Sequence, residues 1–301
     1  MNKSLLADGA LLLVTLNWGL NFVFTKDALT DITPYMYLGL RFLLGALLLI
    51  LIFHKQLKTI SKEDIKGGIV LGLIVFLGFL TQTVGLTYTT PSKSGFITSS
   101  YVVMVPFVVL FLSRVFPGWH QLVGAVITFV GIGIITLSQN ITVNPGDLLT
   151  VICAVCFALQ IVFTERCVKK GNPINIAIVQ VLVIGLIALA AAIITEPIPQ
   201  SYDPGVWGAV IYAAVVCTAG AFAVQNTAQK YTTSTRAAVI LCLESVFAGI
   251  FSILLWGEKL RPKTLLGFLL IFLGVLITEI FPLIAKRTDA KEFNASTNSS
   301  H

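Results

Sequence analysis

The sequence has 301 residues, of which 56% are hydrophobic and only 11% are charged, and its mean hydropathy is +0.91. A soluble globular domain carries roughly twice that share of charged residues, so this composition excludes a soluble protein and indicates an integral membrane protein. The net charge of +6 would suggest nucleic acid as a partner in a soluble protein, but here basic residues in short loops serve to orient the chain in a membrane.

Ten apolar segments are candidates for membrane-spanning helices, since a helix needs about 20 apolar residues to cross a bilayer. We expect the first to be retained, because no small-residue cleavage site of a signal peptide follows it. Pro106 is expected to kink the fourth helix. In chain order the segments lie near residues 8–27, 35–53, 67–92, 94–113, 121–146, 147–166, 171–195, 204–229, 237–257 and 264–281.

Lysine and arginine are distributed unequally between the two sides of the membrane. Ten spans place both termini on one side, which receives 14 of these residues, while the other side receives 5. Cytoplasmic loops carry an excess of Lys and Arg. We therefore predict a multi-pass protein of a bacterial-type cytoplasmic (inner) membrane with both termini in the cytoplasm.

The chain contains the same pattern twice. A shift of 143 places residues 88–134 on 231–277 with 11 of 47 positions identical, "YTT" falls on "YTT", and Gln82 falls on Gln225. A shift of 139 places "LNFVFTKDALTDITP" on "LQIVFTERCVKKGNP". Five helices per copy, an odd number, turn the second copy upside down, and inverted repeats are a recurring plan of secondary transporters with the substrate site between the halves.

The sequence therefore predicts an all-α integral membrane fold of ten transmembrane helices arranged as two inverted five-helix repeats. The first repeat is expected over residues 1–140 and the second over 141–282, followed by a polar cytoplasmic tail over 283–301 that we expect to be disordered. In this alignment Tyr101 is the partner of Glu244.

Several motifs resemble those of EamA-type members of the drug/metabolite transporter superfamily. They are "NWGLNFVFTK", "LRFLLGALLL", "QTVGLTYTTPSKSGFITSSYVVMVP" and the "GE" of Gly257–Glu258. The resemblance covers about residues 5–281 and implies a carrier that exports metabolites such as amino acids by alternating access, without an ATP-hydrolysing module. The first copy lacks the "GE", which favours a role for Glu258 at a helix end or loop rather than in substrate transport.

Glu244 is an acid well inside an apolar segment, "ILCLESVFAGIF". A charged side chain at the centre of a bilayer costs about 2.5–3.5 kcal/mol on insertion scales, so we expect Glu244 to face a polar central cavity. There it could bind an ammonium group or exchange a proton, because burial disfavours its ionised form. The alternative is a structural hydrogen bond to a neighbouring helix.

Six further residues are candidate substrate-binding groups, and four of them have a structural alternative. Gln82 and Gln225 offer donors and acceptors suited to a zwitterion, or they bond neighbouring helices together. Trp18 and Tyr101 could contact a ligand with their rings, or they pack against other helices. The complete predicted site is Trp18, Asn21, Gln82, Tyr101, Gln160, Gln225 and Glu244.

Other polar residues are predicted to lie outside the site. Arg41 lies about seven residues into the second segment, and although it could neutralise an anionic substrate, we expect it to snorkel to the surface or pair with an acid there. Cys153 and Cys156 have redox spacing but lack a cationic neighbour that would activate a thiol. The three histidines do not suggest a metal site. We predict no catalytic residue, no metal and no cofactor.

The sequence predicts transport rather than catalysis. We predict a secondary transporter that exports small organic metabolites such as amino acids by alternating access through a central cavity. One alternative is a proton-coupled exporter of cationic drugs with Glu244 as the counter-ion. Another is a membrane-embedded enzyme. The spans contain no HExxH motif, no GxSxG motif and no paired carboxylates, which argues against this alternative. The expected partners are a small-molecule substrate and the lipid bilayer, without nucleic acid; proton coupling and oligomeric state stay open.

Overall fold

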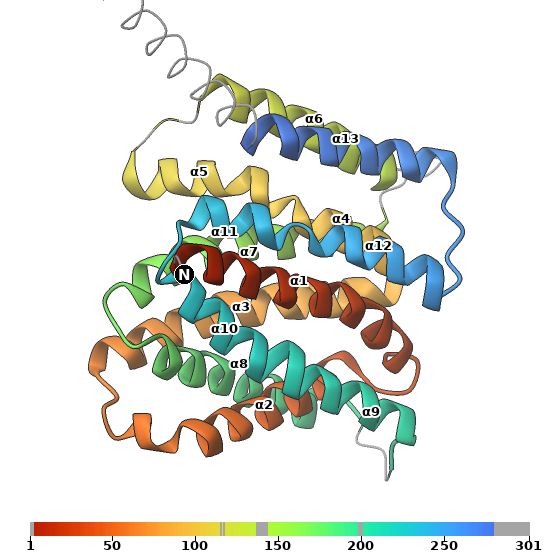
Figure 1. Ribbon diagram of the computed structural model, residues 1–301. Helices are drawn as coiled ribbons and strands as arrows, with labels where there is room; N and C mark the ends of the chain where they lie inside the picture. The colour runs from red at the N-terminus through yellow and green to blue at the C-terminus, as the bar shows by residue number, and fades with distance from the viewer. Residues whose placement is uncertain (1–2, 115, 117, 137–143, 198–200, 280–301) are drawn as a thin grey trace, which may run out of the picture.

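The computed structural model describes residues 3–114, 116, 118–136, 144–197 and 201–279, and all regular structure within these ranges is helical. The helices run side by side along the molecule (Figure 1). Eight helical segments of the described chain are long and apolar enough to cross a membrane, and two further apolar segments are shorter. The predicted tail, 283–301, and the predicted boundary between the repeats lie outside the described residues.

Each of the ten predicted segments falls on a helix of the structure. The first half holds α1 (Lys3–Ala28), α2 (Pro34–Leu57), α3 (Lys62–Tyr88), α4 (Pro91–Ser99), α5 (Tyr101–Ser113) and α6 (Trp119–Thr136). The second half holds α7 (Pro145–Val168), α8 (Pro173–Thr195), α9 (Pro204–Tyr212), the π-helix η1 (Ala213–Gly220), α10 (Ala221–Gln229), α11 (Ser234–Leu241), α12 (Glu244–Leu255) and α13 (Pro262–Glu279).

Local sequence explains where most of these helices begin. Proline occupies the first helical position of six of them, where its missing N–H costs no hydrogen bond. A polar residue usually precedes it: Asn144 and Asn172 each accept backbone N–H bonds as N-caps. α3 begins five residues earlier than the predicted segment, because Ser61 and Asp64 form a capping box at its start.

Two of the spans are broken at equivalent positions. Ser100 separates α4 from α5, and Cys242 and Leu243 separate α11 from α12. The shift of 143 that aligns the two copies places Ser100 on Leu243. Pro106 does not end its helix, since α5 runs through it, and the break in this span lies at Ser100, whose hydroxyl donates to the Ile97 carbonyl at 2.6 Å.

A third span changes its winding rather than breaking. α9 continues into η1, a π-helix of eight residues, and then into α10. π-helical turns are rare and occur frequently at functional sites. This feature was not predicted from the sequence.

Helices of the two halves pack against each other throughout the bundle. α2 lies against α8, and α6 lies against α13 at one edge (Figure 1). The contact of α3 with α7 corresponds to that of α10 with α1, and the contact of α3 with α8 corresponds to that of η1 with α2. In the same way, α4 and α5 contact α7, and their counterparts α11 and α12 contact α1. Each of these contacts between the halves thus has a counterpart when the halves are exchanged.

Small residues allow the closest of these approaches. A Cβ atom added at Gly72 of α3 would lie 2.8 Å from the side chain of Val183 on α8. One added at Gly274 of α13 would lie 2.5 Å from the Gly124 carbonyl of α6. Substituting either glycine would force the helices apart.

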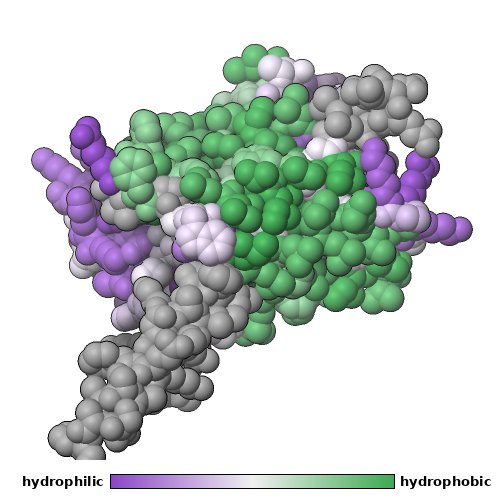
Figure 2. Space-filling model, turned by 90° about the horizontal axis from the view of Figure 1, so that it is seen from above, coloured by the Kyte–Doolittle hydropathy of each residue, from purple (hydrophilic) through white to green (hydrophobic). Residues whose placement is uncertain are grey.

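The surface has the pattern of a membrane protein. Figure 2 shows a broad hydrophobic zone between two hydrophilic ends. We call the end at which α1 begins the N-terminal face and the end at which α1 finishes the opposite face. The apolar helices and this zone together establish a multi-pass membrane protein.

Candidate functional site

A cavity lies between the two halves of the bundle, lined by residues of both. A water-sized sphere can place its centre in only about 40 Å³ of it, so the cavity is narrow in this conformation. All seven predicted site residues line it: Trp18, Asn21, Gln82, Tyr101, Gln160, Gln225 and Glu244.

Glu244 and Tyr101 occupy equivalent places in the two broken spans. Each is the first residue of the helix that follows the break, Tyr101 in α5 and Glu244 in α12. The positive end of the α12 dipole favours a carboxylate at that position. The hydroxyls of Tyr101 and Ser99 lie beside the Glu244 carboxyl, but neither makes a hydrogen bond of ordinary geometry to a described residue. Glu244 is buried, with 4% of its surface exposed, and forms no ion pair within the described chain.

Three glutamines line the cavity, and each is bonded to a side chain of another helix through one end of its amide group. Gln160 donates to the Gln225 amide oxygen at 3.2 Å, and Gln82 donates to the Thr98 hydroxyl at 3.1 Å. The Gln225 amide nitrogen is buried and has no partner among the described residues. The bonded ends of these amides therefore have the structural role, while the Gln225 amide nitrogen keeps an unused donor.

The remaining two predicted residues lie on α1. Asn21 donates to Thr25 at 3.1 Å, and its buried amide oxygen has no partner in the described part of the chain. The Trp18 indole donates to the Cys217 carbonyl of η1 at 2.9 Å and packs near the ring of Phe222. Trp18 thus has the packing role that was the alternative to ligand contact, although its side chain still lines the cavity.

Arg41 of α2 corrects the sequence-based expectation. It does not snorkel to the surface and does not pair with an acid of the described chain: it is 2% exposed and lines the cavity. Its Nε donates to the Thr218 hydroxyl at 2.9 Å, and its Nη2 donates to the Cys217 carbonyl at 3.4 Å. The reason is η1, whose winding presents both groups to α2. Aromatic rings complete the walls: Phe22, Phe79, Phe157 and Phe222.

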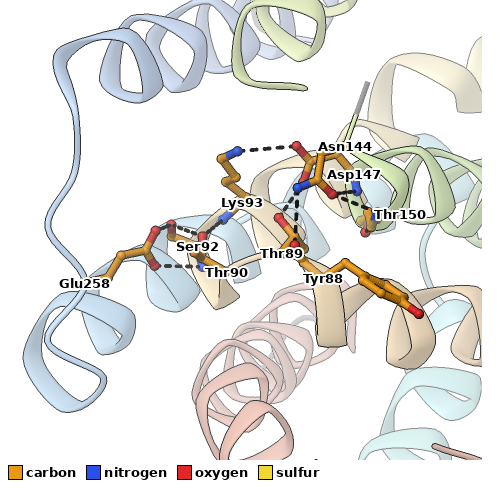
Figure 3. Close-up of polar contacts among 10 residues, drawn as sticks. Tyr88, Thr89, Thr90, Ser92, Lys93, Asn144, Asp147, Thr150 and Glu258 are labelled. Carbon is orange, nitrogen blue, oxygen red and sulfur yellow. Dashed lines mark hydrogen bonds and ion pairs between the residues drawn. The ribbon is translucent and has the colours of Figure 1, made fainter. Parts of the chain in front are cut away.

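Polar side chains close the opposite face (Figure 3). Asp147, at the start of α7, is fully buried; it accepts a hydrogen bond from Thr89 and pairs with Lys93 at 3.4 Å. Glu258 accepts hydrogen bonds from Ser92, at 2.6 Å, and from Ser252. Glu258 therefore acts at a helix end and does not line the cavity, as the missing "GE" of the first copy suggested.

The N-terminal face carries an equivalent ion pair. Asp8 of α1 pairs with Arg236 of α11, whose side chain is 53% exposed. The two shifts that align the copies place Asp8 on Asp147 and Lys93 on Arg236. One ion pair thus recurs at both ends of the bundle, buried at the opposite face and half-exposed at the N-terminal face.

Comparison with known proteins agrees with this architecture. The sequence profile described as the EamA-like transporter family matches twice, over residues 5–137 and 144–280. An uncharacterized transporter of Archaeoglobus fulgidus is 34% identical over 278 residues, which cover 92% of this chain and 87% of that protein. The chain belongs to the EamA-like transporter family.

Other relatives and one solved structure are more distant. The uncharacterized transporter YyaM of Bacillus subtilis is 27% identical and covers 86% of this chain and 88% of its own. The S-adenosylmethionine uptake transporter of Rickettsia felis is 22% identical over 61% of this chain and 63% of its own. A crystal structure with a TM-score of 0.67 and 15% identity, covering 93% of this chain and 98% of that one, shares the fold. Family and relatives point to a transporter rather than an enzyme.

Proposed function

We propose that this EamA-family protein is a secondary transporter that exports small organic metabolites such as amino acids through the central cavity. The observation that carries the proposal is Glu244, a buried acid without an ion-pair partner in the described chain, at a helix start on the wall of the cavity between the two halves. Ionisable residues inside a membrane commonly mark substrate or ion pathways. The export direction rests on the resemblance to metabolite exporters.

The proposed architecture is ten transmembrane helices in two inverted repeats, residues 1–140 and 141–282. Three observations support it. The family profile matches once in each half, contacts between the halves occur in exchangeable pairs, and the breaks at Ser100 and Leu243 coincide under the alignment shift. Broken helices at the repeat interface are a common way to build a midplane substrate site.

The proposed mechanism is alternating access controlled by the two equivalent ion pairs. Opening the opposite face to the cavity separates Lys93 from Asp147, whereas opening the N-terminal face separates Asp8 from Arg236. Because the two halves are inverted copies, the same rearrangement that opens one face closes the other. Each pair then forms only while its own face is closed.

The proposed role of Glu244 is to bind the ammonium group of the substrate. In a cavity shielded from water the ionised carboxyl is disfavoured unless a cation stabilises it. A proton and a substrate ammonium group therefore compete for the same carboxyl. This competition would couple substrate movement to proton movement in the reverse direction.

We also propose that both termini lie in the cytoplasm, because the basic residues lie mainly on that side. Ser201 and Lys58 are exposed at opposite ends of the bundle. A membrane-impermeant thiol reagent applied to intact cells should label the Ser201→Cys variant and leave Lys58→Cys unlabelled. The reverse pattern would invert the orientation.

The second candidate is a proton-coupled exporter of organic cations. Glu244 favours it when considered alone, because a carboxylate can serve as the counter-ion of a cationic substrate. Uptake into proteoliposomes with a panel of amino acids and organic cations separates the two. We expect amino acid transport by the wild type and loss of it in Glu244→Gln. Glu258→Gln is the matched control, since it makes the same chemical change at a carboxyl outside the cavity. Transport of cations alone would establish the second candidate, and transport of neither class would refute both.

A further inference from the structure

The guanidinium of Arg41 is a buried charge that the described protein does not neutralise. It lies inside a predicted membrane span, 2% exposed, and no carboxylate of the described chain lies within ion-pair distance of it. Burying an unpaired charge is expensive. Its position on the cavity wall means that an anion entering the cavity could supply the missing partner.

Its surroundings fix the guanidinium while leaving part of it free. The Phe42 and Phe79 rings lie 5.1 and 4.9 Å from its central carbon, within cation–π distance. Of its five N–H groups, one on Nε bonds to Thr218 and one on Nη2 bonds to Cys217. The Tyr37 hydroxyl is a further hydrogen-bonding neighbour of the guanidinium, so at least two N–H groups of the terminal nitrogens are left. The two terminal nitrogens therefore keep the paired donors that hold a carboxylate in bidentate geometry.

The polar groups around Arg41 differ from those around Glu244. The Tyr37 hydroxyl lies near Arg41 and bonds to Thr25 at 2.9 Å, which in turn accepts from Asn21. Glu244 is instead accompanied by Tyr101 and Ser99. One cavity therefore offers a guanidinium and, separately, a carboxyl group, each with its own polar neighbours.

We infer that Arg41 binds a carboxylate of the transported substrate, so that the cavity selects zwitterions over simple amines. This inference rests on the proposed function, because it assigns the second charged group of the same site. It also explains why an arginine is kept within a span instead of reaching the surface. A substrate carboxylate bound at Nη1 and Nη2 would form an ion pair with the guanidinium, just as the substrate ammonium group would form one with Glu244.

The test compares three ligands that share one carbon skeleton. Leucine carries both charges, 3-methylbutylamine lacks the carboxylate, and 4-methylpentanoate lacks the amine. Binding to purified wild-type protein is measured by calorimetry. We expect leucine to bind about 10- to 100-fold more tightly than the amine, the range for a charge-assisted hydrogen-bonding partner. Equal affinity of the two would overturn the inference without any variant being needed.

Variants then assign the preference to a residue. In Arg41→Gln the affinity for leucine divided by the affinity for the amine should fall to near one. Glu244→Gln should keep that affinity ratio and instead lose the preference for leucine over 4-methylpentanoate. Arg41→Lys keeps the positive charge but loses the planar pair of N–H donors, so its affinity ratio should lie between those of the wild type and Arg41→Gln. An unchanged ratio in Arg41→Gln would refute the role. If Arg41→Gln does not fold, the Arg41→Lys ratio decides in the same way.

The same ligands separate this inference from the proposed function. Binding of 4-methylpentanoate that depends on Arg41, in a protein that transports no amino acid, would support the carboxylate site and refute amino acid transport. Transport of leucine with an Arg41-independent ligand preference would do the opposite.

Discussion

Arg41 and Glu244 are both buried, line the same cavity and have no ion-pair partner in the described chain, but the protein holds them differently. Arg41 is fixed by two hydrogen bonds to η1 and by two aromatic rings. Glu244 has hydroxyls beside it but no hydrogen bond of ordinary geometry to them. The difference indicates a permanent, pre-organised cation and a carboxyl group that can change partners.

The largest effect is expected from removing the exchangeable charge. Glu244→Gln keeps the shape of the side chain but can neither bind an ammonium group as an anion nor exchange a proton. We expect transport to fall about 10- to 100-fold. In the wild type, protonation of Glu244 removes the anionic partner, so transport measured across about pH 5.5–8.5 should weaken toward the acidic end, and this dependence should disappear in the variant. Wild-type behaviour of Glu244→Gln over that range would show that the acid is only structural.

Loosening the fixed charge should have a smaller effect. Thr218→Val removes the hydroxyl that accepts from Arg41 Nε while keeping the guanidinium in the cavity. Because Thr218 positions the guanidinium and does not itself contact the ligand in this account, we expect a loss of only roughly 2- to 10-fold in affinity for leucine, with little change for 3-methylbutylamine. Thr227→Val, on α10 and outside the cavity lining, is the control. An equal loss for both ligands would mean that Thr218 supports the fold rather than Arg41.

The amides test whether uncharged polar groups discriminate as well. Gln82→Ala and Gln225→Ala should each weaken substrate binding by roughly 2- to 10-fold, with expression and thermal stability largely retained. Calorimetry and a melting curve for each variant provide the measurement. Loss of folded protein, with normal transport by the fraction that survives, would assign both residues to helix packing instead.

The smallest effects are expected at the two faces. Lys93→Gln should favour opening of the opposite face, and Arg236→Gln should favour opening of the N-terminal face. Exposed ion pairs contribute about 0–1 kcal/mol, so the half-exposed Arg236 should matter less than Lys93, whose partner Asp147 is fully buried. Opening of each face is measured by the rate at which a thiol reagent, added from one side or the other, labels a Gln82→Cys variant. If both substitutions shifted these labelling rates in the same direction, the gating role would be contradicted.

The sequence predicted the cavity better than it predicted how the cavity is built. Glu244, Tyr101 and the paired glutamines could be found because the duplication aligns them and because polar groups are rare within apolar spans. The position of Arg41 could not, since its depth in its own helix permits snorkelling, and the groups that hold it inward belong to η1, about 180 residues away in the chain. No sequence signal that we considered indicated a π-helix there.

The break before Tyr101 gives the same lesson on a smaller scale. Pro106 drew attention in the sequence, but the interruption of the span lies six residues before it, and α5 continues through Pro106. The break lies where serine hydroxyls can satisfy freed carbonyls and where the equivalent span of the second copy is also broken. The predicted alignment contained that equivalence, because Tyr101 was already paired with Glu244.

The central claim is that substrate crosses the membrane through one cavity that opens alternately to the two faces. Counterflow tests it most directly: proteoliposomes are loaded with unlabelled leucine, diluted, and exposed to a trace of labelled leucine. Transient accumulation of label in loaded but not in empty proteoliposomes is the result that alternating access predicts. Equal uptake of label by loaded and empty proteoliposomes would contradict it.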